Sequence, residues 1–218
     1  MKKKIVILGS TGSIGKSLIN ILKKEKKNIQ IHLLSAHKNY KELLNQARIF
    51  NVKNLIITDI ESFKKLKSKS KKFKINVFNN YDDFKKIFKY KIDYVMSSVT
   101  GIDGLYPTLK IIKYTKTIAI ANKESLICGW GLINKELIKK NTKFVPVDSE
   151  HFSLWYGLIN KNKETVENIY LTASGGPFFK TPIKKLKNVE IKEALRHPNW
   201  SMGNKISIDS ATMMNKVF

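Results

Sequence analysis

The chain is short of cysteine and arginine and has no long apolar run, and each shortage excludes a class of protein. Its 218 residues include one cysteine, Cys128, so no internal disulfide can form. The apolar run after the N-terminal lysines, Ile5 to Leu8, ends at Gly9 and is too short for a signal peptide. No other stretch approaches the length of a membrane span. We therefore expect a reducing, cytoplasmic setting and no membrane partner.

Acidic residues are also scarce, and the resulting basic charge invites a nucleic-acid interpretation. Basic residues number 41 and acidic residues 17, for a formal net charge of +24. Only Arg48 and Arg196 are arginines, although sites that recognise nucleic-acid bases or bind phosphates with two hydrogen bonds favour arginine. The lysines are scattered over predicted solvent faces of helices, as in Lys64-Lys65 and Lys139-Lys140. We therefore expect no nucleic-acid partner, whereas an anionic substrate or cofactor is compatible with the charge.

Short apolar runs alternate with amphipathic segments over most of the chain. Strands are predicted at Lys4–Leu8, Ile29–Ser35, Asn54–Thr58, Ile75–Phe78, Tyr94–Ser97 and Thr117–Ala121, and a short apolar strand at Phe144–Val147. Helices are predicted between them at Gly12–Lys24, Tyr40–Phe50, Ile60–Lys69, Asp82–Tyr90 and Gly104–Tyr114. This βαβ rhythm predicts an α/β fold with a Rossmann-like, doubly wound parallel sheet.

The regular alternation of apolar and amphipathic segments ends near residue 148, where we place a domain boundary. Beyond it, Ser149–Ile159 is predicted to be a helix and Asn168–Ala173 a strand. From there to Ser207 the chain is rich in loops, with Pro182 and Pro198 among them. The sequence thus predicts one domain over residues 1–148 and a second over residues 149–218.

A glycine-rich segment follows the first predicted strand. Gly9-Ser10-Thr11-Gly12-Ser13-Ile14-Gly15 lies between that strand and the first predicted helix, as a G-x-x-G-x-x-G variant of the dinucleotide fingerprint. Glycines allow a tight turn and a close approach of the backbone to a pyrophosphate, and the helix N-terminus supplies amide donors. This placement predicts a dinucleotide site.

The end of the second predicted strand bears on which nucleotide is bound. An NAD site usually has an acid there for the ribose 2′-hydroxyl. Here the strand ends in Ser35-Ala36-His37-Lys38-Asn39, without an acid. An ammonium and an amide suit a 2′-phosphate, so the sequence favours NADP(H). The alternative is that Lys38 is one more surface lysine.

Two further segments place polar residues at predicted strand ends. Ala121-Asn122-Lys123-Glu124-Ser125 follows a late strand, where it would contact cofactor and substrate or would simply begin a helix with an ordinary ion pair. Pro146-Val147-Asp148-Ser149-Glu150-His151 places two carboxylates two residues apart. Such a pair suits a hard divalent cation, which prefers oxygen ligands. The alternative is a capped helix with Asp148 or Ser149 as cap and Glu150 in its first turn.

Six motifs in order give the chain a family resemblance: GSTGSIG, ANKES, PVDSEH, SGGPF, RHPNWSMG and IDSATMMNK. With them the chain resembles 1-deoxy-D-xylulose 5-phosphate reductoisomerase from residue 3 to residue 216. That family serves the methylerythritol phosphate route to isoprenoid precursors. The resemblance implies an NADPH-binding Rossmann domain over residues 1–148 and part of an α+β catalytic domain, for metal and substrate, over residues 149–218.

The resemblance also implies roles for individual residues. The NADPH pyrophosphate would be held by Thr11, Gly12, Ser13 and Ile14. The adenosine ribose and its 2′-phosphate would be held by His37, Lys38 and Asn39, although family members often have a glycine at the position of His37. Further cofactor contacts would come from Asn122, Glu124 and Gly203. The divalent metal (Mg²⁺, Mn²⁺ or Co²⁺) would be bound by Asp148 and Glu150.

The substrate in this family is a small phosphorylated sugar. The resemblance implies that it and its phosphate would be surrounded by Lys123, Ser149, Glu150, Ser174, His197, Ser210, Asn215 and Lys216. Trp200 would close over it as part of a lid. The full-length family form is expected to be a homodimer.

The chain departs from the family pattern at its end. After Met-Asn-Lys the pattern continues Gly-Leu-Glu, and that glutamate is the third carboxylate ligand of the metal; here Lys216 is followed by Val217-Phe218. The remaining catalytic domain and the C-terminal helical domain are absent from the sequence. We therefore expect a truncated or frame-shifted form that binds NADPH, binds metal weakly and turns over little.

Three other interpretations compete with a working reductoisomerase. The first is a non-catalytic NADPH-binding remnant, which metal-dependent product formation would exclude. The second is another Rossmann oxidoreductase, such as a semialdehyde dehydrogenase, which needs a nucleophilic cysteine; Cys128 is expected to be buried among apolar residues and unsuited to that role. The third is a nucleic-acid binder, which strongly salt-dependent DNA binding would support.

Overall fold

The computed structural model describes residues 2–199, 201 and 203–217 of the chain. It divides into two compact units, Met1–Ile159 and Asn160–Phe218, which we call the sheet unit and the C-terminal unit. This division follows the helix that begins at Ser149, whereas the domain boundary was predicted near residue 148. The functional division at residue 148 stays a prediction.

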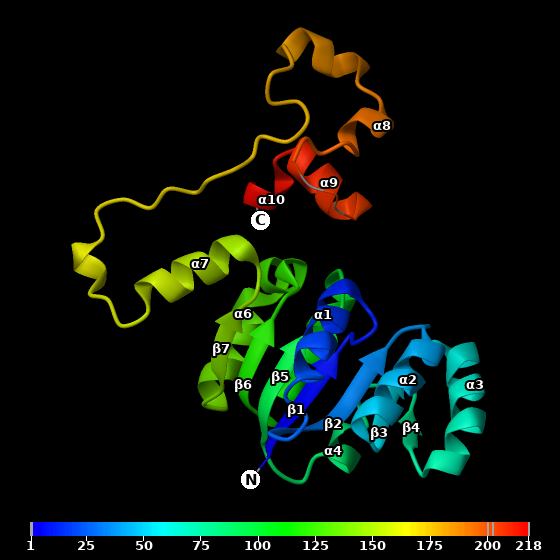
Figure 1. Cartoon of the computed structure of the whole chain (residues 1–218). Helices are drawn as coiled ribbons and strands as arrows, with labels where there is room; N and C mark the ends of the chain where they lie inside the picture. Colours follow the sequence, from blue (N-terminus) through cyan, green and yellow to red (C-terminus); the bar gives the residue numbers. More distant parts are fainter. Residues whose placement is uncertain (1, 200, 202, 218) are drawn as a thin grey trace. The chain divides into compact units, whose positions relative to one another are not determined.

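The sheet unit is built on one seven-stranded sheet with the strand order β4-β3-β2-β1-β5-β6-β7 (Figure 1). Every neighbouring pair is parallel. The strands are β1 (Lys3–Leu8), β2 (Ile29–Ala36), β3 (Asn54–Ile57), β4 (Asn76–Phe78), β5 (Ile92–Ser97), β6 (Thr115–Ile120) and β7 (Lys143–Pro146). The predicted doubly wound parallel sheet is confirmed, and every strand predicted before residue 148 is present.

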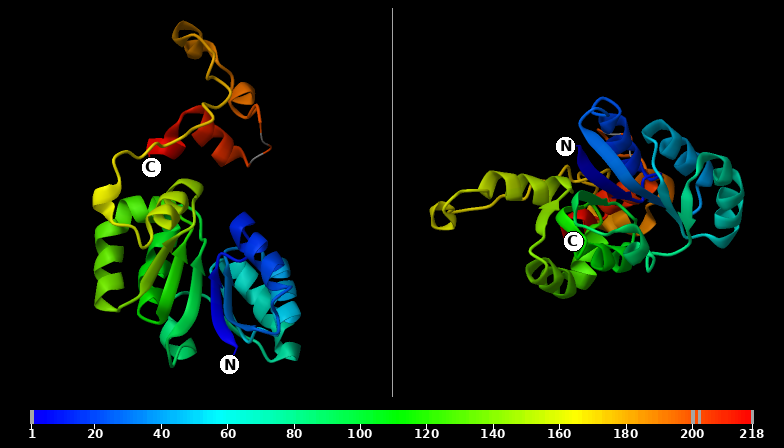
Figure 2. Two further views of the ribbon diagram at one scale, coloured as in Figure 1. Left: turned by 60° about the vertical axis from the view of Figure 1, so that its left-hand side comes forward. Right: turned by 90° about the horizontal axis from the view of Figure 1, so that it is seen from below.

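Helices cover both faces of this sheet, as the views in Figure 2 also show. They are α1 (Ser13–Leu22), α2 (Tyr40–Phe50), α3 (Ile60–Ser70), α4 (Phe84–Ile87), α5 (Leu105–Ile112), α6 (Lys123–Lys139) and α7 (Ser149–Leu158), with short 3₁₀ turns η1 (Lys71–Phe73) and η2 (Ile102–Gly104). The strands are apolar on both sides because both faces are buried.

Alternate strand residues supply two separate cores. Ile5 and Ile7 of β1 face a cluster with Ile19 of α1 and Leu43 of α2. Val6 and Leu8 face the opposite cluster, which contains buried residues of α4, α5 and α6. Because successive side chains of a strand point to opposite faces, this alternation places α1, α2 and α3 on one face and α4, α5 and α6 on the other.

One predicted helix of the sheet unit is much shorter than expected. A helix was predicted over Asp82–Tyr90, but α4 spans only Phe84–Ile87. The chain leaves the helix at Phe88, whose backbone is extended. Phe84, Ile87 and Phe88 are buried in the core, so this segment is held by packing while it crosses the sheet from β4 to β5.

The regular elements among the described residues of the C-terminal unit are all helical. They are η3 (Lys163–Thr165), η4 (Ile183–Asn188), α8 (Ile191–Ala194), α9 (Asn204–Ala211) and α10 (Met214–Val217). The strand predicted at Asn168–Ala173 is not formed, and its residues are exposed. A strand needs a neighbour for its backbone N–H and C=O groups, and the described part of this unit offers none.

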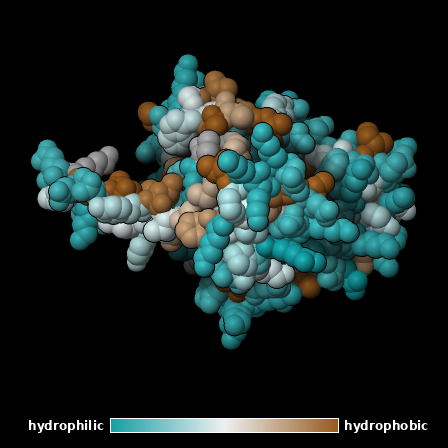
Figure 3. Space-filling view, turned by 90° about the horizontal axis from the view of Figure 1, so that it is seen from above, coloured by the Kyte–Doolittle hydropathy of each residue, from teal (hydrophilic) through white to brown (hydrophobic). Residues whose placement is uncertain are grey.

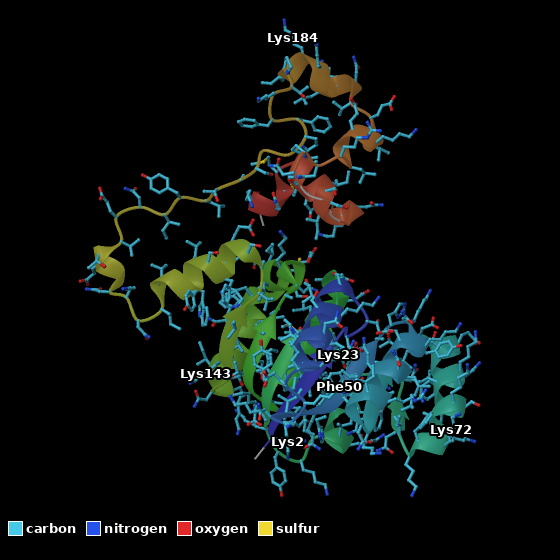
Figure 4. The ribbon with its side chains drawn as sticks, viewed as in Figure 1. Lys2, Lys23, Phe50, Lys72, Lys143 and Lys184 are labelled. Carbon is cyan, nitrogen blue, oxygen red and sulfur yellow. The ribbon has the colours of Figure 1, made fainter. Side chains whose placement is uncertain are left out.

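Surface lysines come from elements throughout the chain. Figure 4 labels Lys23 at the end of α1, Lys72 in η1, Lys143 in β7 and Lys184 in η4. This scatter agrees with the predicted solvated helix faces. Among the described residues, no helix is both long enough and apolar enough to cross a membrane.

Candidate functional site

The carboxyl ends of all seven strands meet at one edge of the sheet, here called the carboxyl edge. The strand order reverses between β1 and β5, which are neighbours although three strands lie between them in sequence. Ligands of doubly wound sheets bind in the crevice at such a reversal. Four predicted segments follow strands at this edge: Thr11–Ile14, His37–Asn39, Asn122–Glu124 and Asp148–Glu150.

The glycine turn, Gly9–Gly12, joins β1 to α1 in a conformation that requires glycine. Gly9 has φ of +79°, and a Cβ there would lie 2.6 Å from the carbonyl oxygen of Ser98. At Gly15 a Cβ would lie 2.4 Å from the carbonyl oxygen of Gly9. Gly12 is the N-cap of α1 and makes no side-chain cap, and the first turn has no acid. The helix therefore presents its leading amides and its positive dipole end to an anion.

Three buried side chains that sequence reasoning missed hold the glycine turn. Ser35 binds it twice, because its carbonyl accepts from Ser10 N at 2.8 Å and its Oγ accepts from Gly9 N at 3.1 Å. Gln46 of α2 donates to the Ser10 carbonyl at 3.1 Å, and Ser98 donates to the Leu8 carbonyl at 2.7 Å. A sequence signal existed only for Ser35, which is a polar residue within an apolar strand.

The end of β2 forms the predicted ribose corner. His37 Nδ1 lies 2.9 Å from Thr58 Oγ1, and Asn39 caps α2 by accepting from Glu42 N at 3.1 Å. Lys38 is exposed, which fits both a 2′-phosphate ligand and a surface lysine. The arrangement leaves these two interpretations open.

An acid does lie beside this corner, and it comes from the turn after β3 rather than from the end of β2. Asp59 caps α3 by accepting from Ser62 N at 2.9 Å. That backbone hydrogen bond, the Ser62 side chain and the charges of Lys38 and His37 lower the pKa of the Asp59 carboxyl. The prediction that β2 ends without an acid is correct for the strand itself. Asp59 nevertheless lies beside that end, because β3 is the neighbour of β2 in the sheet.

At the end of β6, Asn122 is buried, and both hydrogens of its Nδ2 and one lone pair of its Oδ1 are engaged. Its oxygen accepts from Ser125 N at 2.9 Å as the cap of α6, and Nδ2 donates to the carbonyls of Val99 and Gly101. A donor hydrogen bond from Nδ2 to the cofactor would have to replace one of these bonds, whereas Oδ1 can still accept one. Lys123 and Glu124 follow in the first turn of α6 and are partly exposed.

The carboxylate pair begins α7. Asp148 is the N-cap: its Oδ1 accepts from His151 N at 2.9 Å and lies 2.7 Å from His151 Nδ1. Ser149 and Glu150 occupy the first turn, with Ser149 exposed and Glu150 partly exposed. The capped-helix interpretation is therefore confirmed, and it leaves the second Asp148 oxygen outside these contacts. Within the described ranges, no three His, Cys, Asp or Glu residues are arranged to hold a metal.

In the C-terminal unit, residues far apart in sequence form a polar cluster around Ser174. Its Oγ lies 3.0 Å from His197 Nε2 and 3.5 Å from Ser210 Oγ. Asn199 N donates to His197 Nδ1 at 3.1 Å, so a neutral His197 carries its proton on Nε2 and donates to Ser174. This tautomer makes the pair a donor set rather than a serine nucleophile with its base.

Other predicted residues of this unit lie nearby in sequence. Asn215 Oδ1 is buried and has no hydrogen-bond partner in the described part of the chain, which is a costly state unless a ligand or water donates to it. Lys216 is partly exposed, and Gly203 caps α9 at a position where a Cβ would have no atom within 4 Å. Trp200, the predicted lid residue, lies outside the described residues.

The expectation for Cys128 is wrong, because the side chain is exposed. The buried face of α6 is formed by Ser125, Gly129, Ile133 and Leu137, which recur every four residues. Cys128 falls off that face although its sequence neighbours are apolar. Burial therefore does not exclude thiol chemistry at Cys128.

Comparisons with known proteins identify two matching family models. The first, 1-deoxy-D-xylulose 5-phosphate reductoisomerase, matches residues 5–130, and the second, the C-terminal domain of the same enzyme, matches residues 144–218. A curated relative, 1-deoxy-D-xylulose 5-phosphate reductoisomerase from Pelagibacter ubique (strain HTCC1062), is 61% identical over 218 residues. That alignment covers 99% of this chain and 56% of the relative.

Two solved structures are similar over nearly the whole chain. The reductoisomerase from Zymomonas mobilis in complex with NADPH has a TM-score of 0.89 at 35% identity, covering 99% of this chain and 56% of that one. A reductoisomerase complex with NADPH, fosmidomycin and magnesium has a TM-score of 0.84 at 33% identity, covering 98% and 55%. The chain thus spans about half the length of the relatives it matches. It belongs to the 1-deoxy-D-xylulose 5-phosphate reductoisomerase family.

Proposed function

We propose that this chain takes part in the NADPH- and metal-dependent rearrangement and reduction of 1-deoxy-D-xylulose 5-phosphate to 2-C-methyl-D-erythritol 4-phosphate, in the non-mevalonate isoprenoid pathway. One observation carries the proposal: the carboxyl edge gathers an uncapped helix N-terminus, a basic ribose corner and an Asp-x-Glu pair. Solved relatives described as complexes with NADPH, fosmidomycin and magnesium support it.

The cofactor part of the proposal is NADPH on the β1 side of the carboxyl edge. Thr11–Ile14, at the start of α1, would take the pyrophosphate, because uncapped amides at a helix N-terminus favour phosphate oxygens. His37, Lys38 and Asn39 would take the ribose and its 2′-phosphate. Asn122, Glu124 and Gly203 are the further proposed cofactor contacts.

The metal part of the proposal is a divalent cation, Mg²⁺, Mn²⁺ or Co²⁺, on Asp148 and Glu150. The donor set fits a hard cation, since both groups are carboxylates and Asp148 keeps one oxygen outside its cap contacts. When bound, the metal would act as a Lewis acid on the substrate carbonyl. Ser149 and Lys123 would orient the sugar, and Lys123 adds a positive charge that suits an anionic substrate.

The substrate phosphate would be bound by the cluster around Ser174. Hydroxyls of Ser174 and Ser210, the imidazole of His197, the amide of Asn215 and the ammonium of Lys216 form a donor set suited to a phosphate dianion. The unpartnered Oδ1 of Asn215 is an acceptor, so it would bind a hydroxyl of the sugar or a water, and only its Nδ2 could donate to the phosphate. Trp200 would exclude water as part of a lid.

We also propose a homodimer for the full-length form and a cytoplasmic location. The single cysteine of the chain fits a reducing compartment. Light scattering of the full-length family form would test the dimer.

The competing proposal is a remnant that binds NADPH without turnover. The test is NADPH oxidation by the purified chain with 1-deoxy-D-xylulose 5-phosphate and Mn²⁺, with and without a chelator. Chelator-sensitive loss of NADPH absorbance, with formation of 2-C-methyl-D-erythritol 4-phosphate, supports the enzyme. Bound NADPH without product supports the remnant, and absence of NADPH binding overturns both.

A further inference from the structure

A chain of hydrogen bonds leads from the glycine turn into the core. Gly9 N donates to Ser35 Oγ at 3.1 Å, and Ser35 Oγ lies 3.3 Å from the hydroxyl of Tyr81. Ser35 is fully buried on β2, and Tyr81 is partly buried on the segment between β4 and α4. Three segments that are remote in sequence therefore share one polar contact directly beneath the proposed pyrophosphate site.

The direction of this chain follows from its chemistry. A backbone amide only donates, so Ser35 Oγ accepts from Gly9. The hydroxyl hydrogen of Ser35 is then still available to donate to another acceptor. Tyr81 Oη is the partner at hand, and burial raises the pKa of the Tyr81 hydroxyl, which keeps it protonated. Whichever hydroxyl donates, the bond restricts the rotation of the Ser35 side chain and aims its lone pair at Gly9.

Tyr81 is a firm anchor because its ring belongs to the aromatic part of the core. The ring centroids of Tyr81 and Phe84 lie 5.7 Å apart, and Phe84 is almost completely buried. Gly9 is fixed on its other side, where the carbonyl of Ser98 leaves no room for a side chain. A turn held from both sides has little freedom to move its amides.

We propose that Tyr81 is a positioning residue for the glycine turn: through Ser35 it fixes the Gly9 amide and so sets the leading N–H groups of α1 for a pyrophosphate. This inference rests on the proposed NADPH function. Tyr81 acts on the part of the ligand that the turn binds, and it leaves the ribose corner at His37–Asn39 unaffected.

Two ligands separate this role from a general structural one. NADPH carries a pyrophosphate, whereas adenosine 2′-monophosphate carries only the ribose and the 2′-phosphate. In the full chain, Tyr81→Phe and Ser35→Ala each weaken NADPH binding about three- to tenfold, the equivalent of one hydrogen bond. Both variants leave the affinity for adenosine 2′-monophosphate unchanged. Tyr94→Phe, which removes a partly buried hydroxyl from the other face of the sheet, is the matched control and changes neither affinity.

The order of action is tested by combining the variants. Because Tyr81 acts only through Ser35, the double variant binds NADPH no more weakly than Ser35→Ala alone. Amide exchange of Gly9, followed by NMR without any ligand, reports the turn directly and quickens in Tyr81→Phe but not in Tyr94→Phe.

Three results would overturn the inference. An equal loss of affinity for both ligands in Tyr81→Phe would make Tyr81 an adenosine contact or a general stabiliser. Unchanged NADPH affinity and unchanged Gly9 exchange would remove any role in the turn. Additive losses in the double variant would separate Tyr81 from Ser35. If the unsubstituted chain bound no NADPH, the proposed function would fail, and the exchange of Gly9 would still decide whether Tyr81 holds the turn.

Discussion

At the scale of single residues, Lys38 and Asp59 put opposite charges beside the proposed ribose corner. If Lys38 binds the 2′-phosphate, Lys38→Ala weakens NADPH binding by about tenfold or more, since a charge-assisted hydrogen bond is lost. Binding of NADH, which lacks that phosphate, changes little.

Asp59→Asn keeps a residue able to cap α3 but removes a negative charge, so it tightens NADPH binding modestly. Fluorescence titration with both cofactors measures these effects.

Lys41 supplies the control for Lys38, because it is an exposed lysine on the first turn of the adjacent helix α2. Lys41→Ala should leave both affinities within about twofold, as exposed charges contribute little. Equal weakening by the two alanine variants would mean that Lys38 is one more surface lysine and that NADP selectivity lies elsewhere.

Asp148 has two possible roles, as helix cap and as metal ligand, and one substitution separates them. Asparagine caps helices as well as aspartate does, but it carries no charge. Asp148→Asn therefore leaves the helicity of α7 intact and weakens Mn²⁺ binding roughly tenfold or more, because affinity of such sites follows the count of charged ligands. Circular dichroism and Mn²⁺ titration by electron paramagnetic resonance measure the two effects. Unchanged Mn²⁺ affinity would leave Asp148 as a cap alone.

At the scale of elements, Asp93 ties three strands together at the amino ends of β1, β5 and β6. It accepts from Lys4 N at 2.8 Å and pairs with Lys116 Nζ at 2.7 Å. The Lys116 hydrogen bond and then the Lys4 amide lower the pKa of the Asp93 carboxyl below its ordinary value of 3.8. A carboxyl with a lowered folded pKa stabilises the fold above its unfolded pKa and loses that contribution as the pH falls through the folded pKa.

Asp93→Asn is therefore expected to reduce the free energy of unfolding near neutral pH, by less than about 1 kcal/mol because the pair is partly exposed. The difference from the unsubstituted chain stays constant down to about pH 5 and shrinks below the ordinary carboxyl value of 3.8. Urea denaturation at several pH values measures it. A difference that grows toward acid pH would contradict the assigned cause.

Several elements of the sheet unit could be predicted because each strand is a short apolar run with both faces buried. The adjacency of strands could not be predicted this way, and for that reason Asp59, which follows β3 and caps α3, was missed beside the end of β2. The strand expected at Asn168–Ala173 failed for a related reason: apolar residues suit a strand, but only a neighbouring strand can satisfy its backbone. The local sequence pattern indicates the propensity of a segment to form a strand, whereas the pairing of that strand depends on the whole fold.

The residues of the candidate site likewise fall into those that the local sequence could indicate and those that it could not. Asp148, Asn39 and Asn122 stood out from sequence because they are polar residues directly after predicted strands, and in the structure all three cap helices. Ser35 and Tyr81 did not, because a single serine in an apolar strand and a single tyrosine in a polar connecting segment belong to no motif. Cys128 was misplaced because its apolar neighbours suggested burial, while the four-residue spacing of the buried face of α6 excludes it.

At the scale of the whole molecule, the basic charge is a surface property rather than a site. Figure 3 shows hydrophilic residues over most of the face in view, with hydrophobic residues in small separate groups. Lysines on α1, η1, β7 and η4 belong to both units, so the charge has no single focus. Such a surface favours the approach of anionic ligands in general without selecting one.

The proposed cofactor site lies almost entirely in the sheet unit, and this makes a whole-molecule prediction possible. Residues 167–174 are exposed and without regular structure, and Tyr170 in their middle is 83% exposed. We expect chymotrypsin to cut first after Tyr170, because exposed irregular segments are the preferred sites of proteolysis. The fragment that contains the sheet unit should bind NADPH about three- to tenfold more weakly than the intact chain, because it lacks the proposed Gly203 contact, the equivalent of about one hydrogen bond.

Tyr170→Ala provides the control, because it removes the preferred cut and should prolong the life of the intact chain in mass spectrometry time courses. Tyr94, paired within β5, should resist cleavage until the sheet unit unfolds. A large loss of NADPH affinity in the fragment would assign part of the cofactor site to the C-terminal unit, where Gly203 is the proposed contact. Retained affinity would instead make Gly203 dispensable for binding and confine the NADPH site to the carboxyl edge of the sheet.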